Sequence, residues 1–303
     1  MKRHTLIVIT GPTAVGKTRV AIELARALEC DIINADSRQI YRNIPICTAA
    51  PTTQEQAMAK HHFVEFRELD EYYSAAQYEA DVMRLLPSLW QHNDYAVMCG
   101  GSMMYVDAVC RGIDEIPNIS DDLRDRVLRD LENIGLEGLL AELEIVDPEY
   151  YAQVDKCNTR RVVHAIEICR QTGVPYSSLR TGQVKQRDFN IVKIGLNMER
   201  TLLFDRINRR VDIMMEQGLE QEARNVYHLR HLNSLNTVGM KEMFAHFDGT
   251  MDFITARERI KKNTRVYAKK QLTWLARDTS IHWISPTTSA HDIIALVQQT
   301  ITL

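Results

Sequence analysis

The chain has no long apolar segment. None of its 303 residues lies in a run approaching the roughly eighteen apolar residues that a membrane-spanning helix needs. The basic N-terminal stretch MKRHTLIVIT differs from a signal peptide, because its apolar run at 6–9 is short and leads into a glycine loop. We therefore expect a cytoplasmic protein with no membrane association.

Closely spaced cysteine pairs, low-complexity tracts and internal repeats are also lacking. The six cysteines form no C-x-x-C motif and have no histidine-rich partner segment, which argues against a structural zinc site and favours free, partly buried thiols. With 45% hydrophobic and 25% charged residues, the composition is that of an ordinary globular protein with one large or two smaller domains. The cysteines stand at positions 30, 47, 99, 110, 157 and 169.

A strong overall charge is lacking too, but the net charge of −3 conceals an uneven distribution. Residues 114–155 contain thirteen acidic residues and three arginines. Residues 157–210 contain eleven basic and four acidic residues, and residues 257–277 contain eight basic residues and one glutamate. Solvated helix faces would account for any one of these runs. Two basic segments in a mildly acidic protein nevertheless favour a local site for a polyanion.

Short apolar strands separated by helical patterns indicate the fold class. Strands are expected at 5–10, 31–35, 95–99, 192–196 and 281–285, with helices at 17–30, 201–223 and 254–276. This alternation predicts an α/β fold, a P-loop NTPase-like parallel sheet flanked by helices.

The interval 113–186 has no convincing strand and contains helical patterns at 123–131 and 160–170. Gly173-Val174-Pro175 gives a clear helix stop at the end of the second pattern. We therefore predict that 1–112 and 187–303 form the α/β catalytic core, and that 113–186 is a helical insertion domain.

The strongest chemical signal is GPTAVGKT at 11–18, between a predicted strand and a predicted helix. In this pattern backbone N–H groups at a helix N-terminus surround a phosphate, a lysine neutralises the outer phosphate, and a hydroxyl can ligate Mg²⁺. The lysine is Lys17 and the hydroxyl is that of Thr18. The predicted phosphate site comprises Gly11, Pro12, Thr13, Ala14, Val15, Gly16, Lys17 and Thr18.

Two further strand ends carry polar residues. Asp36 follows the second strand and should face the same crevice as the glycine loop. It could be a helix N-cap, as could Ser37, or a Walker-B-like magnesium ligand, or a general base. The third strand ends in Cys99-Gly100-Gly101, without the aspartate of a conventional ATPase, and Ser102 then brings a hydroxyl to the crevice.

Basic residues recur at helical spacing toward the C-terminus. Arg206 and Arg210 lie four apart, so both could reach one anion, although a solvated helix face is the alternative. On the helix predicted over 254–276, Lys261, Arg265 and Lys269 share a face that suits phosphate-backbone contacts with a nucleic acid. The side chains expected nearer the core are Val266, Leu272, Trp274 and Leu275.

Together these motifs resemble the tRNA dimethylallyltransferase (tRNA isopentenyltransferase) family, nearly from end to end. The matching segments are GPTAVGKT, INADSRQIYR, CTAAPT, CGGSMMYVDAVCRG, NTRRVVHAIEICRQTGVPYSSL, RINRRVDIMMEQGLEQEA, NTVGMKEM and TRVYAKKQLTWLARD. The glycine loop is shared with many families, whereas DS-x-Q-x-Y and TR-x-x-A-K-x-Q-x-TW are far more specific. No zinc-finger extension like that of eukaryotic members is present, so we expect a bacterial-type enzyme.

The resemblance implies transfer of a dimethylallyl group from dimethylallyl diphosphate to N6 of adenosine-37, beside the tRNA anticodon, without phosphoryl transfer. Asp36 would accept the N6 proton, and Ser102 stands where the family usually has a threonine contacting the reaction centre. Arg210 would clamp the diphosphate with Lys17, and Thr18 would serve Mg²⁺.

The resemblance also implies a set of tRNA contacts. The insertion would close over the anticodon stem-loop, and we expect the protein to act as a monomer. The implied contacts are Asp36, Ser37, Arg38, Gln39, Ser102, Arg124, Arg160, Arg161, Val162, Val163 and His164, to which the basic helix adds Arg265 and Lys269.

The chain departs from the family pattern at a few positions. GGSMMY at 100–105 replaces the usual GGTGLY, Met240 stands where an aromatic residue is common, and His164 stands where an arginine is usual. Ser102 keeps the hydroxyl, so the chemistry is expected to survive, while Met103, His164 and Met240 bear on the choice of tRNA or on rate.

Two other function classes fit parts of the pattern. A P-loop kinase that phosphorylates a small metabolite with ATP explains the glycine loop and Asp36, but it leaves the basic C-terminal helix without a role. A non-catalytic RNA-binding module with a degenerate nucleotide site explains the basic helix, but it gives Asp36 no chemistry.

Overall fold

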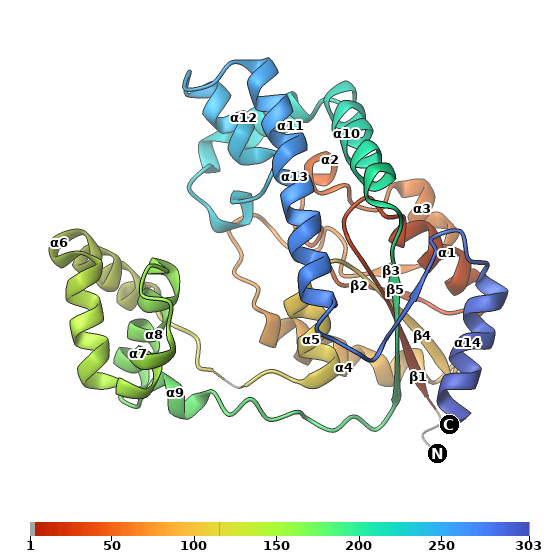
Figure 1. Ribbon diagram of the computed structural model, residues 1–303, viewed down its shortest axis with the longest axis horizontal. Helices are drawn as coiled ribbons and strands as arrows, with labels where there is room; N and C mark the ends of the chain where they lie inside the picture. The colour runs from red at the N-terminus through yellow and green to blue at the C-terminus, as the bar shows by residue number, and fades with distance from the viewer. Residues whose placement is uncertain (1–3, 115, 303) are drawn as a thin grey trace. The chain divides into compact units, whose positions relative to one another are not determined.

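The computed structural model describes residues 4–114 and 116–302. The chain forms two compact units (Figure 1), and each is described separately. The core unit consists of Met1–Cys110 and Gln186–Leu303, and the insert consists of Arg111–Lys185. The sequence predicted an insertion at 113–186, and the insert in the structure spans 111–185.

A parallel sheet of six strands forms the centre of the core unit, in the order β3-β2-β4-β1-β5-β6. All five predicted strands agree with observed ones, β1, β2, β4, β5 and β6, to within two residues at each end, whereas β3 is only two residues long and was missed. The strands are β1 (Thr5–Thr10), β2 (Ile32–Asn34), β3 (His61–His62), β4 (Tyr95–Cys99), β5 (Asn190–Leu196) and β6 (Ile281–Ile284).

Helices cover both faces of this sheet. Along β1, Leu6 and Val8 belong to one hydrophobic cluster while Ile7 and Ile9 belong to the other, because successive side chains of a strand point to opposite faces. A strand buried on both faces reads as a continuous apolar run, which is why TLIVIT was recognisable. The helices are α1 (Lys17–Ala27), α2 (Pro45–Thr48), α3 (Thr53–Met58), α4 (Ala75–Leu89), α5 (Met103–Arg111), α10 (Arg200–Glu216), α11 (Leu219–Val226), α12 (Met240–Phe247), α13 (Phe253–Leu275) and α14 (Ala290–Thr302), with 3₁₀ turns at Tyr227–Leu229 and Asn233–Leu235.

Three expectations about the C-terminal helices were wrong. The helix predicted over 201–223 is two helices, because Gly218 (φ 98°) adopts a left-handed conformation between α10 and α11. On α13, Val266 and Trp274 are exposed at 41% and 38%, and the Trp274 indole donates to Asp107 instead of packing in the core. Lys261 is buried between Asp212 and Glu258, so it is no part of an exposed basic face.

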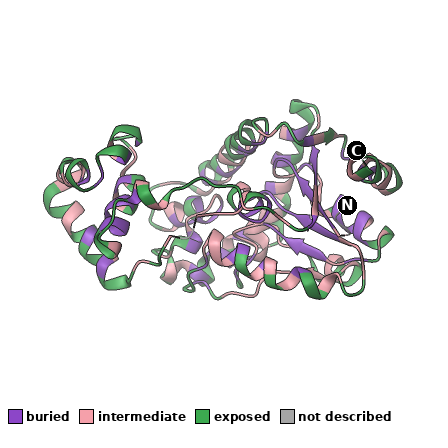
Figure 2. Cartoon of the chain, turned by 90° about the horizontal axis from the view of Figure 1, so that it is seen from below, coloured by how far each residue is buried: buried purple, intermediate pink, exposed green. Residues whose placement is uncertain are grey.

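The described residues of the insert form helices joined by irregular segments, with no strand, and the insert has its own apolar core (Figure 2). A buried carboxylate, Asp147, joins its parts by accepting hydrogen bonds from the backbone N–H groups of Tyr150 and Ser177 and from the Ser177 hydroxyl. The helices are α6 (Asp121–Val146), interrupted at Gly135, α7 (Pro148–Gln153), α8 (Thr159–Thr172) and α9 (Tyr176–Leu179).

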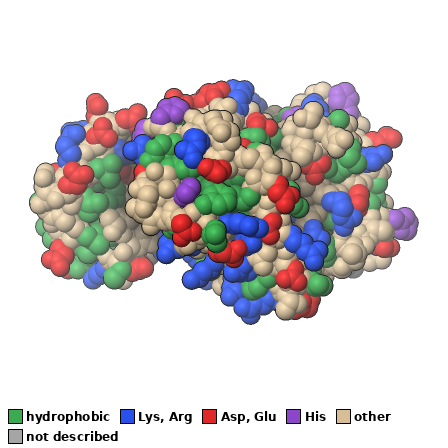
Figure 3. Space-filling view, turned by 90° about the horizontal axis from the view of Figure 1, so that it is seen from above, with side chains coloured by type: hydrophobic (Ala, Val, Ile, Leu, Met, Phe, Trp, Pro, Cys, Tyr) green, Lys and Arg blue, Asp and Glu red, His purple; other side chains and the backbone are tan. Residues whose placement is uncertain are grey.

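The surface carries both signs of charge. On the face seen in Figure 3, basic side chains gather at several places between acidic ones. Among the described residues no helix is both long and apolar enough to cross a membrane. All six cysteines are free thiols, four of them buried, as the sequence predicted.

Candidate functional site

The carboxyl ends of β1, β2 and β4 meet an open crevice of about 900 Å³ in the core unit. Parallel α/β sheets bind ligands at this edge, because the loops that follow neighbouring strands converge there. Residues of the glycine loop, α10, α13 and the segment 45–56 complete the walls. The lining includes Lys17, Thr18, Asp36, Gly100, Arg206, Arg209, Arg210, Tyr267 and Gln271.

The glycine loop lies between β1 and α1, as predicted. Gly16 (φ 110°) turns the chain into α1, and a Cβ at Gly11 would lie 2.6 Å from the Leu196 carbonyl oxygen of β5. Glycine is therefore required at both ends of the loop. Inside it, the Lys17 Nζ donates to the carbonyl oxygens of Gly11 and Pro12 at 3.1 and 2.9 Å.

Burial controls the protonation of Lys17. Loss of hydration lowers the pKa of its ammonium group from 10.5 to about 8, although the charge of Asp36 opposes this shift. The thiol of Cys99 is buried as well, which raises its pKa to about 12, so the neighbour stays neutral. Lys17 therefore carries a charge near neutral pH that the surrounding protein solvates poorly.

Two arginines of α10 contact the glycine loop. The Arg206 Nε donates to the Ala14 carbonyl oxygen at 2.9 Å, and the Arg210 Nη1 lies 3.4 Å from the Thr13 hydroxyl. Burial lowers the pKa of the Arg210 guanidinium below its usual value. The structure thus places both guanidinium groups at the phosphate loop, with Arg206 exposed to solvent and Arg210 half-buried.

Asp36 lines the crevice next to the loop. Its Oδ1 accepts hydrogen bonds from the backbone N–H groups of Arg38 and Gln39, at 2.9 and 3.4 Å, within a turn that is not the start of a helix. These bonds hold the carboxylate in place. Among the described residues nothing donates to its Oδ2, which is the oxygen available to a ligand.

Ser102 lies beside this turn and is itself buried. Its Oγ accepts from the Ser37 N–H at 2.7 Å and donates to the Ser37 hydroxyl at 3.1 Å. A Cβ at Gly100 would lie 2.1 Å from the Ala35 carbonyl oxygen, so glycine is needed for the two segments to approach. Ser102 therefore joins the segment after β4 to the segment that carries Asp36.

Several predicted tRNA contacts in the core unit make hydrogen bonds within the protein. Arg38 donates to the carbonyl oxygens of residues 233 and 234, and the Gln39 amide donates to those of residues 48 and 49. Arg265 donates to the Asn208 side chain, and the Lys269 ammonium lies 5.6 Å from the centre of the Phe204 ring. Among these residues Gln39 lines the crevice, whereas Arg265 and Lys269 link α13 to α10.

Sequence reasoning missed two residues of the crevice. Gln271 is buried at 2% exposure and bonds to Thr13 and Gly101, and Tyr267 lines the opening near Asp36. Burial and the Asp36 charge raise the pKa of Tyr267 to about 12, so its phenol is neutral. Gln271 is the glutamine of the TR-x-x-A-K-x-Q-x-TW motif, so the motif could have indicated that this residue matters for function.

The predicted contacts on the insert differ in exposure. Arg160 and Arg161 are exposed in the first turn of α8, and Val163 is half-buried. The Val162 side chain is fully buried in the core of the insert, so this position supplies packing instead of a contact surface. His164 is half-exposed beside Glu167, and Arg124 lies 3.9 Å from the same carboxylate.

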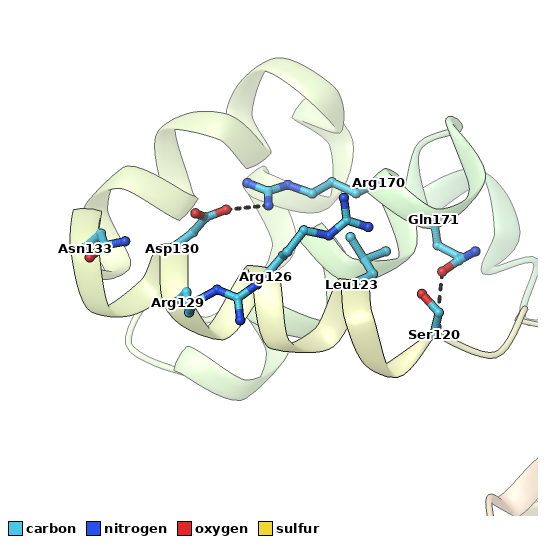
Figure 4. Close-up of a pocket in the computed structure, with 8 residues that line it drawn as sticks. All are labelled: Ser120, Leu123, Arg126, Arg129, Asp130, Asn133, Arg170 and Gln171. Atoms are coloured by element: carbon cyan, nitrogen blue, oxygen red, sulfur yellow. Dashed lines mark hydrogen bonds and ion pairs between the residues drawn. The ribbon is translucent and has the colours of Figure 1, made fainter.

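The insert also contains a polar hollow of about 450 Å³ between α6 and α8 (Figure 4). Arg126, Arg129 and Arg170 line it. Arg170 is held by Asp130 and Glu142, so the acidic residues of the insert balance much of the positive charge. The hollow has no glycine loop, and the crevice of the core unit remains the better candidate for chemistry.

The crevice fits a magnesium ion bound mainly through a ligand. No three His, Cys, Asp or Glu residues among those described are grouped to hold a metal. Mg²⁺ usually keeps several waters and needs only one or two protein oxygens beside substrate phosphates. Thr18 and Asp36 both bring oxygen atoms to this crevice.

Known proteins resemble this chain in both sequence and structure. A family model described as IPP transferase matches residues 39–278. The chain is 53% identical over 282 residues to tRNA dimethylallyltransferase 1 of Phocaeicola vulgatus, covering 93% of this chain and 94% of that protein. It is 51% identical over 294 residues to tRNA dimethylallyltransferase 2 of Porphyromonas gingivalis, covering 97% and 98%.

Two solved structures are similar over the whole chain. The full-length tRNA isopentenylpyrophosphate transferase of Bacillus halodurans aligns with a TM-score of 0.70 and 33% identity, over 99% of this chain and 96% of that one. A eukaryotic dimethylallyltransferase, described as acting on tRNA, aligns with a TM-score of 0.81 and 25% identity, over 99% and 80%.

Proposed function

The chain belongs to the IPP transferase family, and we propose that it transfers a dimethylallyl group from dimethylallyl diphosphate to N6 of adenosine-37 in tRNA. It is a prenyltransferase that acts on tRNA, as its relatives are by name. Membership excludes the two alternatives considered from the sequence, a small-molecule kinase and a non-catalytic RNA-binding module. The observation that carries the proposal is a phosphate loop that shares one crevice with the Asp36 carboxylate.

On the donor side, the crevice suits a diphosphate leaving group. Lys17, Arg206 and Arg210 direct three cationic groups to the glycine loop, and backbone N–H groups at the start of α1 add a favourable dipole. Thr18 would hold Mg²⁺, which when bound supplies further neutralisation of diphosphate charge. These groups stabilise the negative charge that develops as the C–O bond to diphosphate breaks.

On the acceptor side, Asp36 is the proposed general base. The adenine N6 is a weak nucleophile, so removal of its proton during attack on the prenyl carbon lowers the barrier. A new N–C bond forms, the C–O bond breaks, diphosphate leaves with the bonding electrons, and the N6 proton passes to Asp36 Oδ2. The two bonds at Oδ1 fix the carboxylate for this step.

The remaining features concern tRNA. A base in an anticodon loop is more easily swung out of its stack than one in a duplex, so it can reach a recessed carboxylate. We propose that the exposed basic residues of α8, together with Arg124, Arg265 and Lys269, position the anticodon stem-loop. The proposed working form is a cytoplasmic monomer, and light scattering of the protein with and without tRNA tests the monomer.

The decisive experiment is mass analysis of tRNA nucleosides after incubation with dimethylallyl diphosphate and Mg²⁺. The expected product is an adenosine heavier by one isoprene unit at position 37. Asp36→Asn should lower the rate of transfer roughly 10²- to 10⁴-fold while binding of inorganic diphosphate is retained. Unchanged adenosine with intact tRNA binding, or net phosphoryl transfer from labelled ATP, would contradict the proposal.

A further inference from the structure

Gln271 of α13 is a buried polar side chain with both ends of its amide in use. Its Oε1 accepts from the Thr13 N–H at 2.8 Å, and its Nε2 donates to the Gly101 carbonyl oxygen at 2.9 Å. Only 2% of the residue is exposed. A primary amide buried this deeply is costly unless its hydrogen bonds are made, so the side chain is held by these two partners.

The two partners belong to loops with different roles. Thr13 lies in the phosphate loop after β1, where its hydroxyl meets Arg210. Gly101 lies in the turn after β4, and the next residue, Ser102, bonds to the backbone N–H of Ser37. One amide on α13 thus joins the loop for the donor to the segment that carries the acceptor's base.

The fit around this amide is close. A Cβ at Gly101 would lie 2.5 Å from the Gln271 Nε2 and 3.4 Å from the Lys17 Nζ. The φ angle of Gly101 is not in the left-handed region, so any side chain is opposed there by space and not by backbone strain. Glycine at this position leaves room for the amide to reach the main chain beside Lys17.

We propose that Gln271 is a positioning residue that sets the separation between the bound diphosphate and Asp36 during prenyl transfer. The inference rests on the proposed function and assigns to it a residue that acts through the two loops it joins. Direct displacement requires the nucleophile and the carbon in a near-attack arrangement, and a misplacement of about 1 Å can reduce the rate roughly 100-fold. Each loop can still bind its own ligand when the bridge is lost.

The test measures the single-turnover rate and the two affinities separately. Gln271→Met keeps the length of the side chain and removes both hydrogen bonds. We expect the rate of prenyl transfer to fall 10- to 100-fold, while Kd for inorganic diphosphate and for tRNA changes less than threefold. The matched control is Gln298→Met, on the exposed face of α14, with the wild-type rate. A folded Gln271→Met protein with a rate within twofold of wild type overturns the proposal, as does a loss of diphosphate affinity equal to the loss of rate.

A second pair of variants tests the same bridge from its other end. Gly101→Ala pushes the amide away and should reduce the rate to a similar extent. In a Gln271→Ala background, which leaves room for the methyl group, the same change should cost less than threefold, because both substitutions break one contact. An equal cost in both backgrounds overturns the bridge. Absence of prenyl transfer by wild type and Gln298→Met alike instead contradicts the proposed function, so the two failures are distinguishable.

Discussion

Titration of Lys17 should make kcat/KM for dimethylallyl diphosphate depend on pH. Burial lowers its pKa to about 8, and the charged and titratable groups near it are Cys99, Asp36 and Arg210. Only the protonated form can neutralise a phosphate. Protonated Lys17 therefore falls from about nine-tenths of the free enzyme at pH 7 to about one-tenth at pH 9, and kcat/KM for dimethylallyl diphosphate should fall about tenfold over this range.

The assay is kcat/KM for the donor between pH 6 and 10, with tRNA held below its KM so that the free enzyme is the form that titrates. Lys17→Met should reduce activity and flatten the decline above pH 8, because the titrating group is gone while any ionisation of the substrate remains. The control is Lys60→Met, at an exposed lysine. It should keep the wild-type activity and the same decline of kcat/KM above pH 8. A decline that persists unchanged in Lys17→Met would refute the assignment.

The same shift has a consequence for stability. The folded pKa lies below the unfolded value of 10.5, so the unfolded chain binds more protons between about pH 8 and 10.5, and stability rises with pH in that window. The shift corresponds to about 3 kcal/mol. Across this pH window, the free energy of unfolding of the wild type should rise by about this amount relative to that of Lys17→Met. A difference that is constant from pH 7.5 to 10.5 would contradict the buried-charge argument.

Three other predictions concern single side chains. Gly100→Ala would place a methyl group 2.1 Å from the Ala35 carbonyl oxygen, so we expect a lower thermal midpoint and at least a tenfold lower transfer rate. Arg210→Met should weaken binding of inorganic diphosphate roughly 10- to 100-fold in calorimetry, because a hydrogen bond to a charged group contributes about 1.5–3 kcal/mol. Asp147→Ala leaves three buried or half-buried donors in the insert without their acceptor, so hydrogen exchange should accelerate across the insert, while Kd for diphosphate in the core unit stays unchanged.

The sheet and the phosphate loop were predictable because their signals are local. A strand buried on both faces must be apolar along its whole length, and a glycine loop between such a strand and a helix has few other uses. The expected strands at 5–10 and 95–99 agree with β1 and β4 at both ends. In contrast, β3 is formed by two histidines paired to β2, and two residues carry no periodicity.

The faces of α13 were not predictable from spacing. Lys261 looks like a solvent-facing cation until Asp212 of α10 is placed beside it, about fifty positions away in the chain. Trp274 looks like a core residue, yet Asp107 of α5 binds its indole at the surface. Glutamine is usually a surface residue, yet Gln271 is buried because two loops that the sheet order brings together supply partners for its amide. In each case the partner is supplied by tertiary structure.

A glycine loop of this kind holds phosphates whichever bond of the ligand is broken. The reaction is therefore decided by what faces the loop. In this crevice β4 ends in Cys99-Gly100, with no carboxylate at the position where a conventional ATPase carries one, while the free oxygen of Asp36 lies after the neighbouring strand β2. In the proposed reaction, Asp36 serves a nucleophile that attacks the carbon beyond the diphosphate, and the cations at the loop serve the leaving group. On this reasoning, moving the carboxylate to the last residue of β4 by Cys99→Asp with Asp36→Asn should not restore prenyl transfer, and recovered transfer would show that the position of the base is not what selects carbon.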